Sequence, residues 1–121
     1  MFYRRKFYIV KNEFIEPFNT LFNDINLPNQ LKYGARLIGR WMLPHNEETT
    51  EVFAIWEYDS YEAYLKIEDD VRSDMEHLKR IRNWYAEHGG KEFVQKQYFL
   101  EARNEKLVST ISLNKKPSSQ L

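Results

Sequence analysis

Residues 52–58, with the sequence VFAIWEY, form a strand-length run that is apolar at every position except Glu57. A strand that is apolar on both faces needs cover on both faces. The helices predicted elsewhere in the chain suffice for only one of them. A bare apolar sheet face would exceed the patch size that is usual for monomers. The pattern therefore predicts that a second copy of the protein covers the other face.

The first half of the chain combines strand and helix patterns. Bulky and charged residues alternate over 2–10 and predict a strand. Apolar residues then recur at helical spacing over 14–25, and Asn12 is the expected helix cap. A break is predicted at 26–28, before a short helical turn. Alternation over 35–43 predicts the second strand.

The second half starts with a helix that Asp59 or Ser60 is expected to cap. This helix restarts at Ser73, where Ser-x-x-Glu matches a capping box. The glycine pair 89–90 ends the helix. Alternation over 93–102 then predicts the last strand.

The predicted order is strand, helix, strand, strand, helix, strand, which is the βαββαβ order of ferredoxin-like α+β folds. In this fold the first and third strands are central in an antiparallel sheet, and both helices pack on one face. The strand over 52–58 is the third strand, so its second apolar face is expected to pair sheet to sheet in a homodimer. We predict a single domain over residues 1–113 and a disordered tail over 114–121.

The composition restricts the partners and the cellular compartment that we expect for this domain. Eighteen basic and eighteen acidic residues give a net charge of +0, so no net field attracts nucleic acid or an anionic membrane. The chain has no cysteine, which excludes disulfides and suits a reducing compartment. No run approaches the roughly 18 apolar residues of a membrane span. We predict a cytoplasmic protein with no nucleic-acid partner and no membrane span.

Catalytic and metal-binding motifs do not stand out in the sequence. The four glycines form no phosphate loop and the three histidines no zinc motif, so no metal and no cofactor are predicted, and catalytic residues stay unknown. The basic run over 4–6 is interpreted as a solvated strand face. Arg36, Arg40 and Glu57 are expected together on the sheet face opposite the helices, paired with each other or with a polar ligand. Trp41 and Trp56 are core residues or line a ligand pocket.

Three segments resemble the NIPSNAP family: YRRKFYIVKNEFIEPF, LPNQLKYGARLIGRWM and VFAIWEYDSYEAY, which together cover roughly residues 3 to 101. Within them, G-x-L-x-G-x-W appears over 34–41 with one extra residue, and W-x-Y-x-S over 56–60. The resemblance implies a dimeric α+β barrel formed by two ferredoxin-like subunits.

The wider superfamily of this family includes cofactor-free monooxygenases of antibiotic biosynthesis and haem-degrading monooxygenases. The resemblance implies that such activity would use the cavity between sheet and helices. The haem-degrading relatives use a helix histidine, a tryptophan and a first-strand asparagine. His77 and Trp56 fit two of these roles, but the first strand has no asparagine before Asn12.

Two functions follow as hypotheses. The first is a homodimer that binds a small apolar or aromatic ligand, or a protein partner, without turnover. The second is a cofactor-independent monooxygenase in which Arg40 stabilises an anionic substrate. Arg40 facing a water-excluded cavity would favour the enzyme, and an Arg40–Glu57 ion pair would favour the binding protein. The candidate ligand residues are Arg36, Arg40, Trp41, Trp56, Glu57 and His77.

Overall fold

A four-stranded antiparallel sheet forms one layer of the protein in the computed structural model, which describes residues 1–112. The strands lie in the order β2-β3-β1-β4. Their bounds are β1 (Phe2–Lys11), β2 (Arg36–Pro44), β3 (Thr49–Tyr58) and β4 (Phe99–Leu107). The first and third strands are central, which confirms the predicted ferredoxin-like α+β fold. The predicted tail over 114–121 lies outside the described residues.

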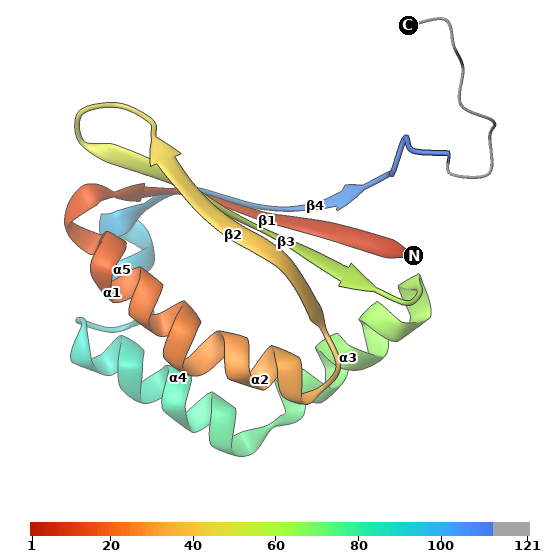
Figure 1. Ribbon diagram of the computed structural model, residues 1–121. Coiled ribbons are helices and arrows are strands. Elements are labelled where there is room, and N and C mark those ends of the chain that lie inside the picture. Colours follow the sequence, from red (N-terminus) through yellow and green to blue (C-terminus); the bar gives the residue numbers. More distant parts are fainter. Residues whose placement is uncertain (113–121) are drawn as a thin grey trace, which may run out of the picture.

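The helices form a second layer, and Figure 1 shows them all on one side of the sheet. Their bounds are α1 (Ile15–Leu21), α2 (Leu27–Lys32), α3 (Tyr61–Ser73), α4 (Met75–Glu87) and α5 (Lys91–Tyr98). We call the opposite side of the sheet the open face. Within residues 1–112, no helix covers the open face.

Strand β3 is apolar on both faces, as its sequence predicted. Val52, Ala54 and Trp56 face the helices and are at most 4% exposed. Phe53 and Ile55 alternate with them and therefore point to the open face, where they stay half-buried. The helices thus cover one apolar face of this strand and leave the other uncovered within the described chain.

The core between sheet and helices consists of two clusters of buried side chains. The first contains Val10, Phe14, Phe18, Leu21, Val52, Trp84 and Val94. The second contains Phe2, Ala35, Ala54, Trp56, Tyr58 and Tyr64. Strands β1 and β3 contribute to both clusters, because their helix-facing residues run the length of the sheet.

Trp41 is not a core residue, contrary to one of its two predicted positions. Its side chain lies on the open face, where 48% of its surface is exposed. The indole packs against the Phe53 ring at a centroid distance of 5.5 Å. It also covers Gly39, where an added Cβ would clash with the indole. The absence of a side chain at position 39 therefore lets Trp41 lie flat on the sheet.

The first helical segment runs without the predicted break at 26–28. A π turn (Phe22–Asn26) joins α1 directly to α2, and Pro28 lies in the first turn of α2. Asn12 does not cap this segment. Its side chain instead accepts a hydrogen bond from Thr50 Oγ1 at 2.6 Å, which ties the helix start to β3.

The predicted strand over 93–102 is wrong in its first part, because residues 91–98 form α5 and β4 begins only at Phe99. Val94 and Tyr98 share one face of a strand and, four residues apart, also share one face of a helix. Val94 is fully buried. Tyr98 stacks on Phe14 at 4.2 Å with the rings 10° apart. These contacts favour the helix, which the alternation alone did not distinguish.

Candidate functional site

A cavity of about 190 Å³ lies between the sheet and the helices. Its apolar walls come from both layers and include Tyr8, Phe18, Phe22, Val52, Ala54 and Trp56. Its polar lining consists of Lys6, Asn26, Gln30, Arg40 and His77. Residues from all strands except β4 and from four helices, α1 to α4, thus meet at one partly open site between the two layers.

A β-bulge in β2 turns Arg40 toward this cavity. The pairing of β2 with β3 shifts register between Leu37 and Gly39, so Ile38 is an extra residue. Arg36 lies opposite Glu57 on the open face, whereas Arg40 lies opposite Ala54 on the helix-facing side. The predicted placement of Arg40 beside Arg36 and Glu57 is therefore wrong. Strict alternation would have put the two arginines on one face, and the extra residue reverses the second.

The Arg40 guanidinium is held by an amide and two aromatic rings. Its Nη1 donates a hydrogen bond to Asn19 Oδ1 at 2.7 Å. Its Cζ lies 4.4 Å from the centre of the Phe22 ring and 5.1 Å from that of Phe18. Nη2 is buried and has no hydrogen-bond partner in the described chain. Burial lowers the pKa of Arg40, although an arginine stays charged in any case.

Lys6 approaches the same cavity from β1. It lies directly opposite Ala54 in the β1–β3 pairing and on the helix-facing side of the sheet. Burial lowers its pKa, an effect that the Glu68 carboxylate partly opposes. No carboxylate of residues 1–112 forms an ion pair with Lys6. The interpretation of residues 4–6 as a solvated strand face is therefore wrong for Lys6.

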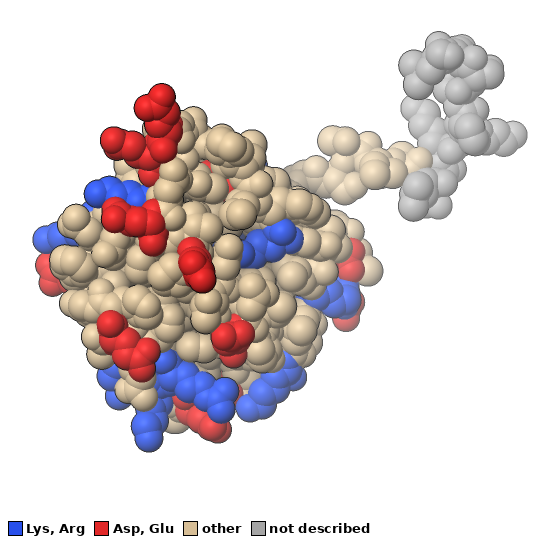
Figure 2. All heavy atoms as spheres, turned by 60° about the vertical axis from the view of Figure 1, so that its left-hand side comes forward, with Lys and Arg blue, Asp and Glu red and all other residues tan. Residues whose placement is uncertain are grey.

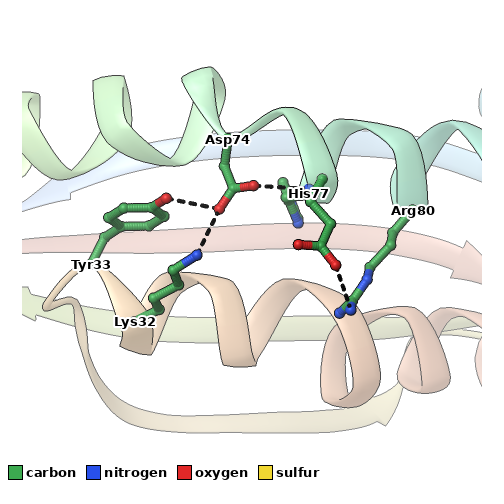
Figure 3. A network of polar contacts seen from close by, with 6 residues as sticks. Lys32, Tyr33, Asp74, His77 and Arg80 are labelled. Carbon is green, nitrogen blue, oxygen red and sulfur yellow. Dashed lines mark hydrogen bonds and ion pairs between the residues drawn. The ribbon is translucent and has the colours of Figure 1, made fainter.

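Asp74 organises the helical side of the site (Figure 3). Its carboxylate accepts hydrogen bonds from the Tyr33 hydroxyl at 2.7 Å, the Lys32 ammonium at 3.2 Å and the His77 backbone N–H at 3.0 Å. These donors hold the pKa of Asp74 well below its ordinary value, and the His77 N–H contributes most. Asp74 rather than Ser73 is the cap of α4. It fixes the end of α2 against the start of α4.

His77 follows Asp74 in the first turn of α4, and its ring lines the cavity. Burial lowers the pKa of His77, and the nearby Asp74 opposes that effect. The ring is therefore neutral near pH 7 and offers the cavity one donor and one acceptor. Gln30 adds a second polar group from α2, and its Oε1 is buried without a partner in residues 1–112.

The predicted ligand residues divide between two sites. Arg40, Trp56 and His77 line the cavity. Arg36, Glu57 and Trp41 lie on the open face. There Arg36 bonds Glu57 at 2.8 Å and Asp59 at 2.8 Å, and Tyr3 donates its hydroxyl proton to Glu57 at 3.0 Å. These bonds lower the pKa of Glu57, mainly through Arg36, so the open-face carboxylate is satisfied within its own chain.

Sequence reasoning missed Lys6, Tyr8, Asn26 and Gln30 as cavity residues. The alternation of the first strand contained the signal for two of them, because Lys6 and Tyr8 share a face with Phe2 and Val10. Asn26 and Gln30 lie beyond the break that was predicted in the first helix. Because the helical segment is continuous there, Asn26 and Gln30 lie four residues apart on one helix face. This face of the π turn and α2 lines the cavity beside the sheet.

The site combines aromatic walls with two cations and a neutral imidazole, which suits a small aromatic molecule with polar substituents. Within residues 1–112, no three His, Asp or Glu side chains cluster closely enough to hold a metal ion. Nor is any helix in that range long and apolar enough to cross a membrane. Figure 2 shows acidic and basic side chains intermixed over the visible face, without a broad area of one sign.

The layers and the cavity define the class of protein: a ferredoxin-like α+β domain with a small site between its sheet and its helices. Residues 3–108 match the NIPSNAP family, so the chain belongs to that family. This match confirms the resemblance seen in the sequence. No curated protein matches the chain.

Solved structures share the fold. A protein from Agrobacterium tumefaciens is 18% identical with a TM-score of 0.68, and the match covers 93% of this chain and 98% of the other. An uncharacterised NIPSNAP domain protein from Burkholderia xenovorans is 20% identical with a TM-score of 0.65, covering 91% and 95%. A NIPSNAP family protein from Agrobacterium tumefaciens is 14% identical with a TM-score of 0.68, covering 90% and 92%. At these identities the similarity shows the fold alone.

Proposed function

We propose that the protein binds a small apolar or aromatic ligand in the cavity between sheet and helices. The observation that carries this proposal is the cavity itself, which has aromatic rings on its walls and the polar residues Lys6, Arg40 and His77 in its lining. A ligand with polar substituents would meet these residues while its ring packs against the aromatic walls. A cavity of roughly 150 Å³ holds benzene, so about 190 Å³ accommodates one substituted ring.

Filling the cavity tests this proposal. Ala54 of β3 lines the cavity on the sheet side, and Ala54→Leu would add three carbon atoms there. Ala102→Leu is the matched control, because Ala102 lies on the same side of the sheet but is exposed. We expect benzamide and related single-ring compounds to bind the wild type and the control, measured by NMR titration, and not Ala54→Leu. Equal binding by all three proteins would contradict the cavity as the site.

The open face supports assembly with a second copy of the chain. Five of its charged residues pair within the chain: Arg36 with Glu57, and Arg5 and Arg103 with Glu105. The area between these pairs contains Trp41, Phe53 and Ile55. A second open face could therefore cover the apolar area while these ion pairs stay intact. We therefore propose that the protein is a homodimer in which the open faces of the two sheets pack together. Its cytoplasmic location stays a prediction.

A second candidate function is cofactor-independent oxygenation, because Arg40 faces a cavity and does not pair with Glu57. In such a reaction phenol plus O2 would give benzoquinone plus water, so O2 is both the oxidant and the source of the new carbonyl oxygen. Arg40 would stabilise the phenolate form of the substrate. The test is O2 uptake with phenol, which Arg40→Gln should abolish. Binding of phenol without O2 uptake would contradict the enzyme and support the binding protein.

A further inference from the structure

We propose that the cavity is selective for an aromatic carboxylate, whose negative charge lies between Lys6 and Arg40. This inference rests on the proposed binding function and adds the chemical class of its ligand. It follows from the position of the two cations in the sheet, from their lack of acidic partners, and from the apolar character of the walls around them.

The sheet places Lys6 and Arg40 on either side of one short side chain. Lys6 on β1 and Arg40 on β2 are both directly opposite Ala54 on β3, so the three residues form one row across three neighbouring strands. Adjacent strands are about 4.8 Å apart, so the two cationic residues start roughly 10 Å apart. Their long side chains can span that distance from both sides, and the methyl group of Ala54 leaves the space between them open.

Neither cation has a carboxylate partner among the described residues, whereas Arg5, Arg36 and Arg103 of the sheet do. Arg36, on the same strand as Arg40, bonds two carboxylates, Glu57 and Asp59. Arg40 bonds only the neutral amide of Asn19, and its Nη2 is buried without an acceptor. A buried charge normally has a partner of opposite sign. The acid that most affects Lys6 is Glu68, which pairs with Arg72 at 3.4 Å.

The remaining walls favour an aromatic carboxylate over a small inorganic anion. Phe18 and Phe22 stack on the Arg40 guanidinium, and Trp56 completes an aromatic wall. Inorganic phosphate would satisfy the two cations but leave these rings without contacts. An aromatic carboxylate satisfies both, because its charge meets the cations while its ring packs against the aromatic side chains.

Matched pairs of probes test the inference: benzoate against benzamide and phenylacetate against phenylacetamide, with inorganic phosphate as a third arm. The members of each pair are similar in size and differ in charge. We expect each carboxylate to bind the wild type at least tenfold more tightly than its amide, measured by isothermal titration calorimetry. Phosphate should bind more weakly than benzoate. Tighter binding of phosphate would overturn the aromatic part of the inference.

Variants that remove one positive charge show which residues cause the preference for a carboxylate over its amide. Arg40→Gln and Lys6→Met should each reduce the preference for benzoate over benzamide, and Arg36→Gln on the open face should leave that preference unchanged. Circular dichroism verifies that each variant is folded. Because two cavity variants are measured independently, the inference can still be tested if one of them does not fold. Equal binding of amide and carboxylate by the wild type would overturn the charge inference and retain the cavity proposal. Binding of none of the probes would overturn both.

Discussion

The two arginines of β2 show how one inserted residue sets a side chain's role. Arg36 and Arg40 are four positions apart, so regular alternation places them on the same face. The bulge at Ile38 separates them, and Arg36 forms ion pairs on the open face while Arg40 enters the cavity. The sequence contains both residues, but the bulge depends on how β2 pairs with β3. Pattern alone therefore predicted a single charged cluster where the structure has two sites.

Asp74 gives a prediction at the residue scale. Asp74→Ala removes the α4 cap and the acceptor for Tyr33 and Lys32, and we expect it to lower the thermal midpoint by about 5 °C at pH 7. Ser73→Ala is the matched control, because Ser73 is exposed and does not cap α4, and it should change the midpoint little. Differential scanning calorimetry measures both. A larger effect of Ser73→Ala would restore Ser73 as the cap.

The pKa of Asp74 sets the pH dependence of this difference. Its pKa is lowered in the folded protein, so its contribution to stability is present above the unfolded value of about 3.9. The contribution is lost as the pH falls below that value and through the folded pKa, where the carboxylate is protonated in both states. The midpoints of wild type and Asp74→Asn should therefore converge in acid and differ most above about pH 5. A difference that grows on acidification would contradict this sign.

At the scale of elements, the strands and the βαββαβ order were predictable, but the last segment was not. A strand pattern over 93–102 also places Val94 and Tyr98 four residues apart, which satisfies a helix equally well. What decides for α5 is contact with residues far away in the sequence, above all the stack of Tyr98 on Phe14. Local periodicity cannot register such contacts, because the partner lies more than eighty positions upstream.

Helix α5 gives the prediction at this scale. Val94→Ala removes two buried methyl groups and should lower the free energy of unfolding by about 2 kcal/mol. Gln95→Ala, one position further on, is exposed and should change it by less than about 0.5 kcal/mol. Urea denaturation followed by circular dichroism measures both changes. Similar losses for the two variants would contradict the burial of one helix face.

At the scale of the whole molecule, the sequence of β3 anticipates the arrangement of layers. Its two apolar faces indicated that cover from one helical layer would leave a second apolar face. The structure has that arrangement, with helices on one side and an open face that carries Trp41 and Phe53. Sheet-to-sheet pairing with a second copy follows as the proposed way to cover it.

A charge on the open face tests this assembly. Light scattering should give the wild type twice the 14.7 kDa mass of one chain. Phe53→Glu adds an unpaired carboxylate to the proposed interface and should weaken dimerisation at least tenfold. Phe93→Glu is the control, because Phe93 lies on α5 and is 48% exposed. A monomeric wild type at micromolar concentration, or an unchanged Phe53→Glu dimer, would contradict the homodimer.

The sequence by itself determined the fold class, the family and the double-sided character of β3, because these follow from periodicity and motifs that are local in the chain. Only the tertiary structure decided which residues meet in the cavity. Lys6, Arg40 and His77 come from three separate elements, and their convergence depends on strand register, on the bulge at Ile38 and on the cap at Asp74. Register and packing are set by contacts between distant segments, which no local pattern encodes.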